Sequence, residues 1–241
     1  MFSVSHKRWR IAQNAEKQTF NYRTDKKPHA NSEFFSQNFL IGSEFFCDKD
    51  ILEVGCSPLA TIHSIKEAHF KVGIDPLAGE WTCFYEKSTS HIQGMGEYLP
   101  FKDGCFDAVL CLNVLDHVQA PSEVLNEIRG CLKERSTLIL WLQTFSTFKV
   151  IKKLLGLFDN PHPHHFSDSD VFSLLKDMGY CINYHKYRKA NIHSAISVIK
   201  KGLIVSGLKS LFANLLLGLH ESSYMCSKGR LKFNENIRQS R

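Results

Sequence analysis

The sequence lacks several patterns that would assign it to a class at once. Its eight cysteines are scattered, with no C-x-x-C pair and no metal-like spacing, which argues against a disulfide framework and indicates a reduced, cytoplasmic chain. The first 17 residues contain no apolar h-region, so we expect no signal peptide. Internal repeats and low-complexity segments are also absent. At 241 residues, 43% of them hydrophobic, the chain can bury the core of one large domain.

Charge is distributed unevenly along the chain. The formal net charge of +6 divides into +5 over residues 1–30, −8 over residues 31–184 and +9 over residues 185–241. Basic ends around an acidic middle indicate either contact with an anionic surface, such as a membrane or a nucleic acid, or simply solvated tails. Charge alone does not decide between these alternatives.

Short apolar runs alternate with amphipathic segments through the middle of the chain, an order that predicts an α/β fold with a mostly parallel sheet between helices. A closing pair of strands predicts an antiparallel addition at one edge. Strands are predicted at 50–55, 70–76, 106–114, 136–144, 181–189 and 194–201, with a further short strand and a loop within 90–100. Helices are predicted at 59–68, 82–88, 122–134 and 167–180, and one or two at 31–47.

The stretch ILEVGCSPLA, residues 51–60, reads as a buried strand that runs into a turn. Ligands bind at such carboxyl ends in open parallel sheets. Gly55 permits a tight turn, and the small Cys56 and Ser57 leave the backbone accessible. The loop lacks G-x-G-x-x-G, which disfavours a nicotinamide-dependent oxidoreductase and suits a ligand without a phosphate. Asp75, at the end of the next strand, can accept hydrogen bonds from both hydroxyls of a ribose.

The segment GMGEYLPFKDGCFDAVLCLNVLDHVQAP, residues 94–121, carries the most specific signal. Together with GIDPLAGEW and LNEIRGCLK it resembles the class I S-adenosylmethionine-dependent methyltransferases, in the methyltransferase type 11, UbiE-like subgroup. The resemblance covers about residues 50–145 and implies a Rossmann-like, seven-stranded sheet with an antiparallel edge strand and helices on both faces. The D/N-P-P-Y motif of amino-nitrogen nucleic-acid methyltransferases is replaced by NVLDHV, so a nucleic-acid acceptor is not expected.

The resemblance also implies which residues contact the cofactor, S-adenosyl-L-methionine. They are Glu53, Gly55, Cys56 and Ser57 at the methionine end, Asp75 at the ribose, Pro76, Leu77, Gly96 and Glu97 around the adenine, and Asn113 near the sulfonium. Two departures stand out. Ser57 and Ala60 occupy positions where many relatives have glycine, and Met95 replaces an aspartate that often contacts the adenine amine.

Histidines near the expected acceptor entrance are the candidate catalytic residues. His164 and His165 belong to NPHPHHFS, residues 160–167, and His117 follows the fourth predicted strand. A histidine there can take a proton from an acceptor hydroxyl, whereas the alternative is a structural lid or a packed ring. The spacing H-x-H-H gives no helical ligand pair, so no metal site is expected.

The two ends of the chain are predicted to lie outside the catalytic core, which we place at residues 49–201. Residues 1–48 would form a basic arm and covering helices, and residues 202–241 an apolar helix and a basic tail. The apolar segment 202–220 either lies in a membrane interface or packs on the domain or at a homodimer interface.

The function predicted from these features is methyl transfer from S-adenosylmethionine to a small-molecule or a lipid- or glycan-linked acceptor. The alternative is a catalytically inactive methyltransferase-like domain that serves as a binding or membrane-associated module. Met95 and the reduced glycine content of the first loop motivate that alternative, whereas Glu53 and Asp75 argue against it.

Overall fold

A computed structural model describes residues 2–21, 32–58, 60–82, 85, 87–146, 162–189 and 218–229. The elements, in chain order, are α1 (His6–Asn21), α2 (Ser32–Phe39), η1 (Ser43–Phe46), β1 (Asp50–Val54), η2 (Thr61–Ser64), β2 (Phe70–Asp75), η3 (Ala78–Glu80), β3 (Ser90–Gln93), β4 (Phe106–Leu112), α3 (Pro121–Cys131), β5 (Leu132–Phe145), α5 (Asp168–Asp177), β6 (Tyr180–Lys189) and β7 (Leu219–Lys228).

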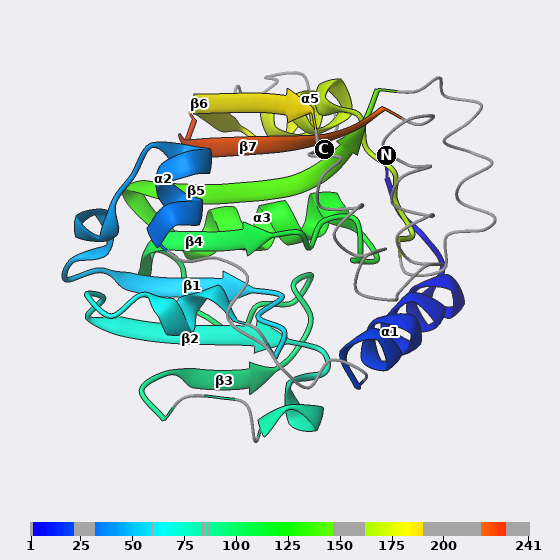
Figure 1. Ribbon diagram of the computed structural model, residues 1–241, viewed down its shortest axis with the longest axis horizontal. Helices are drawn as coiled ribbons and strands as arrows, with labels where there is room; N and C mark the ends of the chain where they lie inside the picture. The colour runs from blue at the N-terminus through cyan, green and yellow to red at the C-terminus, as the bar shows by residue number, and fades with distance from the viewer. Residues whose placement is uncertain are drawn as a thin grey trace, which may run out of the picture.

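The seven strands form one sheet in the order β3-β2-β1-β4-β5-β7-β6 (Figure 1). Strands β3, β2, β1, β4 and β5 pair in parallel, and β7 pairs antiparallel with both β5 and β6. The predicted α/β fold with a mostly parallel, seven-stranded sheet is therefore confirmed. The antiparallel strand lies one position in from the β6 edge.

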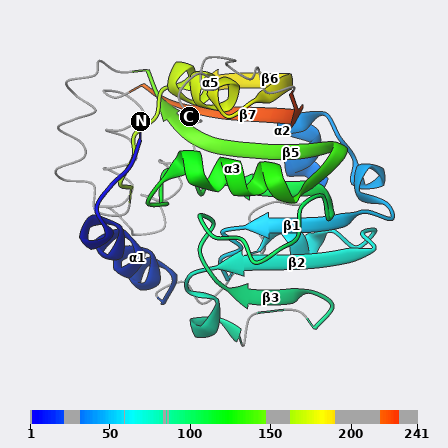
Figure 2. The same cartoon turned by 180° about the vertical axis from the view of Figure 1, so that it is seen from behind.

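Helices cover both faces of the sheet, as predicted. Helices α3 and α5 lie on one face (Figure 2), and α2 lies on the other (Figure 1). The side chains of β1 alternate between two apolar clusters, since Leu52 and Val54 pack under α3 whereas Ile51 packs toward α2. A strand buried on both faces explains why its sequence is a continuous apolar run rather than an alternating one.

Helix α5 begins and ends where the sequence indicates. The Ser167 side chain accepts a hydrogen bond from the backbone N–H of Asp170, and the Asp170 side chain accepts one from the N–H of Ser167. This capping box satisfies two N–H groups that a helix start leaves without a partner. Gly179 follows the helix with a φ of +76°, the left-handed conformation in which glycine ends helices.

The α-helix predicted at residues 59–68 is wrong. The structure has only a single 3-10 turn, η2, in its place. The buried carboxylate of Glu53 accepts hydrogen bonds from the backbone N–H groups of Thr61 and Ile62, at 3.1 and 2.8 Å. These bonds and the β-branched side chains, which have low helix propensity, favour a short turn.

Strand β7 corrects the expectation for the C-terminal part of the chain. Residues 219–228 were expected to end an apolar helix and begin a basic tail, but they lie inside the sheet. Ser222 is fully buried there, with its hydroxyl 2.9 Å from that of Thr144 and donating to Asp168 at 2.8 Å. The strand predicted at 194–201 and residues 202–217 of the apolar segment lie outside the described residues, as do residues 83, 84 and 86 of the helix predicted at 82–88, whose four described residues are not α-helical.

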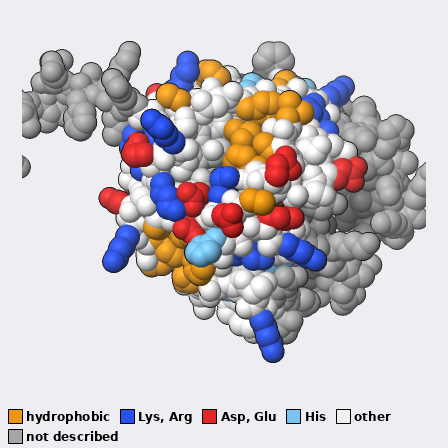
Figure 3. All heavy atoms as spheres, turned by 90° about the vertical axis from the view of Figure 1, so that its left-hand side faces the viewer, with side chains coloured by type: hydrophobic (Ala, Val, Ile, Leu, Met, Phe, Trp, Pro, Cys, Tyr) orange, Lys and Arg blue, Asp and Glu red, His pale blue; other side chains and the backbone are white. Residues whose placement is uncertain are grey.

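The amino ends of the parallel strands are fixed by an ion-pair network. The Lys133 ammonium lies 3.0 Å from Asp50 and 2.7 Å from Asp107, so it joins the starts of β5, β1 and β4. Asp107 also accepts a hydrogen bond from the backbone N–H of Asp50. On the side of the molecule that Figure 3 shows, acidic and basic side chains are interspersed. Within the described ranges, no helix has the length and apolar character needed to cross a membrane.

Candidate active site

A pocket of about 820 Å³, open at its mouth, lies at the carboxyl ends of β1, β2 and β4. In both Figure 1 and Figure 2 the strand arrows point toward α1, which covers this end of the sheet. Eight of the ten predicted cofactor contacts line the pocket: Gly55, Ser57, Asp75, Pro76, Leu77, Gly96, Glu97 and Asn113. The structure thus brings together residues from four separate stretches of the sequence at the location expected for this fold.

Helix α1 supplies one wall of the pocket that sequence analysis missed. Trp9, Gln13 and Glu16, at positions i, i+4 and i+7, face into the pocket. An ion pair of 2.6 Å between Lys17 and Glu80 ties the far end of the helix to η3. The helical spacing of these side chains was the available signal, but the basic composition of the segment suggested a solvated arm.

The loop after β1 has no room for a side chain at its glycine, because it contacts the loop after β4. Gly55 has a φ of +74°, and a Cβ built there would lie 2.3 Å from Cγ2 of Val114. Only glycine fits both the backbone conformation and the space. The Gly55 N–H donates to the Ile74 carbonyl at 2.8 Å, which holds the loop against the end of β2. Ser57 also has a positive φ, of +23°, at a position where many relatives have glycine.

Asp75 ends β2 in the floor of the pocket with 7% of its surface exposed. Its two carboxylate oxygens accept hydrogen bonds from the backbone N–H of Ser57 at 3.2 Å and of Leu77 at 2.8 Å. Burial raises the pKa of Asp75 to about 6, although these bonds oppose the rise. Four lone-pair sites on a carboxylate leave two for a ligand after these bonds are made.

Two predicted contacts, Glu53 and Cys56, do not line the pocket. Glu53 is 3% exposed, and each of its carboxylate oxygens accepts a hydrogen bond from a backbone N–H of η2. Burial raises its pKa to about 7. The Cys56 thiol is buried beside the His91 ring, 3.6 Å from Nδ1, and burial raises its pKa. Neither side chain belongs to the pocket lining, and both support the first loop through contacts outside it. Their contact with a cofactor stays a prediction.

Glu97 and Asn113 both line the pocket, but their side-chain oxygens differ in how many hydrogen bonds they accept. Glu97 accepts hydrogen bonds from the N–H groups of Gln119 and Ala120 at 2.7 and 3.1 Å, so it fixes the start of α3. The side-chain oxygen of Asn113 is buried and has no hydrogen-bond partner among the described residues. A buried acceptor left unpaired costs about 1–3 kcal/mol, so a ligand that donates a hydrogen bond to this oxygen would be favoured.

The lining of the pocket is acidic. Glu16, Asp75 and Glu97 line it, and none of the described lining residues is lysine or arginine. A carboxylate-lined, partly buried cleft attracts cations and repels phosphates. The arrangement fits S-adenosylmethionine, whose sulfonium and ammonium outweigh its single carboxylate, better than it fits a dinucleotide.

The three predicted catalytic histidines lie at different depths. His117 lines the pocket, with Nδ1 3.5 Å from Glu16 and Nε2 3.7 Å from Asp116. His164 is buried, and its Nε2 lies 3.0 Å from the Val118 carbonyl. His165 is buried too, next to the Phe145 ring at 5.6 Å between centroids. Only His117 reaches the pocket.

Comparison with known sequences supports the assignment made from geometry. Residues 52–140 match the model of a methyltransferase domain family. The tRNA U34 carboxymethyltransferase of Nautilia profundicola is 31% identical over 122 residues, which are 47% of this chain and 36% of that protein. The chain spans about a third of the length of the curated relatives it matches.

Solved structures share the fold. One is a putative sarcosine dimethylglycine methyltransferase from Galdieria sulphuraria. Its TM-score is 0.69 at 13% identity, over 82% of this chain and 85% of that one. A geranyl diphosphate methyltransferase in complex with S-adenosylmethionine has a TM-score of 0.63 at 10% identity, over 77% of this chain and 84% of that one. The UbiE-like subgroup stays a prediction. The resemblance to class I S-adenosylmethionine-dependent methyltransferases is confirmed, since residues 52–140 match a methyltransferase domain family and the chain shares the fold of such enzymes.

Proposed function

We propose that this protein transfers the methyl group of S-adenosylmethionine to a small-molecule or a lipid- or glycan-linked acceptor. The observation that carries the proposal is the acidic pocket at the strand ends, in which Asp75 keeps two acceptor sites and Asn113 has a buried oxygen with no partner in the described part of the chain. The geranyl diphosphate methyltransferase that shares this fold binds the same cofactor.

The lining residues suggest how the cofactor would be held. Asp75 would accept hydrogen bonds from the ribose hydroxyls, and Leu77 and Gly96 would flank the adenine. Asn113 would receive the ammonium or face the positive sulfonium with its oxygen. Trp9 on α1 would exclude water from the mouth, which strengthens each of these electrostatic contacts.

The cofactor supplies a methyl group already activated by positive sulfur, so the chain has to position the acceptor and manage one proton. His117 is the predicted histidine placed to take that proton from a hydroxyl, because its ring lines the pocket. Glu16, 3.5 Å from Nδ1, would stabilise the ring once it is charged. His164 and His165 remain predicted catalytic residues that would need to act from beneath the surface.

The acceptor class is argued from the loop that follows β4. NVLDHV stands after β4, where amino-nitrogen nucleic-acid methyltransferases have D/N-P-P-Y, and this favours an acceptor other than a nucleic acid. The match covers about a third of the tRNA U34 carboxymethyltransferase, so we do not extend the substrate of that protein to this chain. Membrane contact through residues 202–220, a homodimer and the domain boundaries stay predictions.

Titration calorimetry with S-adenosylhomocysteine tests the proposal. We expect micromolar binding and no binding of NAD, because the pocket offers carboxylates where a dinucleotide presents phosphates. Incorporation of a labelled methyl group into fractionated small-molecule and lipid extracts then identifies the acceptor. Binding without incorporation into any fraction would favour the inactive module, and failure to bind the homocysteine form would remove the proposed function altogether.

A further inference from the structure

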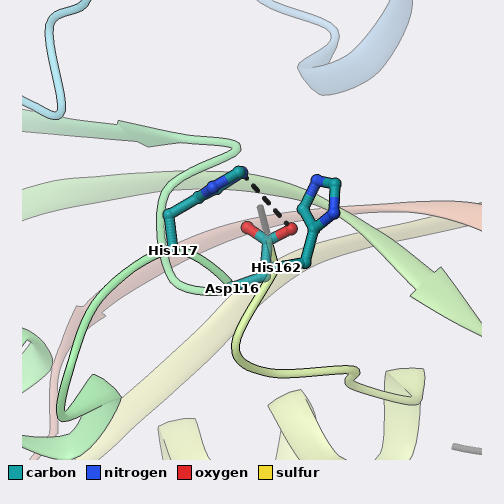
Figure 4. Close-up of side chains that lie close together, drawn as sticks. All are labelled: Asp116, His117 and His162. Carbon is teal, nitrogen blue, oxygen red and sulfur yellow. Dashed lines mark ion pairs between the residues drawn. The ribbon is translucent and has the colours of Figure 1, made fainter. Parts of the chain in front are cut away.

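Three side chains at the edge of the pocket converge on one point. Asp116 and His117 lie in the loop after β4, and His162 lies in the segment before α5. One ligand atom from each can be chosen so that all of them lie within 4.8 Å of one another. Figure 4 shows the Asp116 carboxylate between the two imidazole rings, whose centroids are 4.6 Å apart.

The Asp116 carboxylate is the least satisfied member of this cluster. Only 5% of the residue is exposed, and its Oδ1 atom is buried without a hydrogen-bond partner among the described residues. Its other oxygen, Oδ2, lies 3.7 Å from Nε2 of His117, beyond hydrogen-bond length. An ionised carboxylate this deep requires a paired charge or a metal ion.

The backbone holds the two segments together independently of the three side chains. The N–H of His164 donates to the Asp116 carbonyl at 3.2 Å, and Nε2 of His164 lies 3.0 Å from the Val118 carbonyl. From the other side, the Arg8 guanidinium donates to the His162 carbonyl at 3.1 Å. His164 and Arg8 therefore fix the position of His162 next to Asp116, which a chance encounter of surface side chains would not show.

We propose that Asp116, His117 and His162 bind one divalent transition-metal ion. Two imidazoles and a carboxylate are ligands that zinc and its neighbours prefer, with distances of about 2.0–2.2 Å to the metal. Two ligand atoms on one such ion lie roughly 3–4 Å apart, so the 3.7 Å between Oδ2 and Nε2 requires little movement. Three protein ligands leave at least one position open, as in catalytic rather than structural sites.

The open position gives the site a use, and this step rests on the proposed function. Because His117 belongs both to the cluster and to the pocket, the ion would lie where the acceptor enters. It would bind an acceptor through oxygen, from a hydroxyl or a carboxylate. With Nε2 of His117 on the ion, the ring could not also act as the base, so a bound hydroxyl would release its proton to solvent. Its oxygen would form the new bond to the methyl carbon, and the electrons of the broken carbon–sulfur bond would stay on sulfur.

Sequence analysis predicted no metal site, because the three proposed ligands do not form a local pattern along the chain. The histidine run at residues 160–167 supplies one ligand, His162, and the other two precede it by about 45 residues. The H-x-H-H spacing was the wrong pattern to examine, since His164 serves as an anchor and His165 packs on Phe145.

Cobalt titration of the chelator-treated full-length protein tests the inference. We expect one equivalent of Co²⁺ to bind with visible absorption bands of a low-symmetry site that has nitrogen and oxygen ligands. Asp116→Asn and His162→Asn should each weaken binding by about 10–100-fold, because each replaces a carboxylate or an imidazole by an amide oxygen, a weaker ligand for these metals. His69→Asn is the matched control, because His69 also pairs with an aspartate, Asp50, but lies outside the pocket.

Three results would overturn the proposal: no binding, equal binding by the wild type and both ligand variants, or the intense near-ultraviolet band of a cysteine thiolate bound to cobalt. If Asp116→Asn does not fold, His162→Asn carries the test, because the His162 side chain is only half-buried. Calorimetry with S-adenosylhomocysteine on the same samples separates the two proposals. Cofactor binding without cobalt binding would refute the metal site alone, and cobalt binding without cofactor binding would refute the proposed function alone.

Discussion

Replacement of Asp75 by asparagine is the sharpest test of the cofactor pocket. The carboxylate offers about four lone-pair sites, and the N–H groups of Ser57 and Leu77 use two of them. The remaining two would accept the ribose hydroxyls. Asparagine keeps one oxygen and places an NH2 group where the carboxylate had an acceptor, so one bond becomes a repulsive contact.

The expected loss follows from these contacts. A hydrogen bond to a charged group contributes about 1.5–3 kcal/mol, and a neutral one about 1 kcal/mol. Loss of one charged bond and weakening of the other removes about 3 kcal/mol, which is roughly a 150-fold increase in the dissociation constant for S-adenosylhomocysteine.

Calorimetry on the wild type and on Asp75→Asn measures this change, and thermal unfolding shows whether the variant remains folded. Asp177→Asn, an exposed change at the end of α5, serves as the control and should bind like the wild type. A folded Asp75→Asn protein with unchanged affinity would mean that the ribose does not bind at the end of β2, and the pocket assignment would fail.

Further predictions concern pH, the first loop and α5. Because the pKa of Asp75 is about 6, affinity for S-adenosylhomocysteine should fall by up to about tenfold per pH unit below pH 6. The raised pKa of Asp75 means that this group binds its proton more tightly in the folded state, so its contribution to the free energy of unfolding decreases as pH rises from about 4 to 6. The free energy of unfolding should therefore fall less, or rise more, with pH in Asp75→Asn than in the wild type, which urea denaturation measures. Gly55→Ala should lower the free energy of unfolding by about 2–4 kcal/mol, whereas Gly104→Ala, which has a similar φ and nothing within 4 Å, should cost about 1 kcal/mol; equal losses would contradict the contact with the β4 loop. Ser167→Ala should cost about 1 kcal/mol in the same assay, and no loss would mean that the capping box contributes nothing.

Apolar runs and local motifs predicted the elements around the pocket. The run at 106–114 became β4, the amphipathic segment at 122–134 became α3, and Gly179 ended α5 as expected. These features are set by nearby residues, through burial of one face or by the backbone freedom of a glycine. The same local logic placed Asp75 at the end of β2 and next to the first loop.

Features that depend on distant partners escaped sequence analysis. The buried Glu53 carboxylate ties up the N–H groups of η2, and no local pattern shows that a helix start is occupied in this way. Strand β7 contains the fully buried Ser222, whose hydroxyl has partners in Thr144 of β5 and Asp168 of α5. Trp9 became a pocket residue only because α1 lies across the strand ends.

The place of β7 in the sheet sets the order in which the fold can be completed. Of the strands that the structure describes it comes last in the sequence, yet it lies between β5 and β6. During synthesis the ribosome releases β6 before β7, its neighbour in the described sheet, exists, and the long β5 keeps an open hydrogen-bonding edge until residues 219–228 emerge. The sheet of the nascent protein is therefore completed only when β7 inserts between β5 and β6.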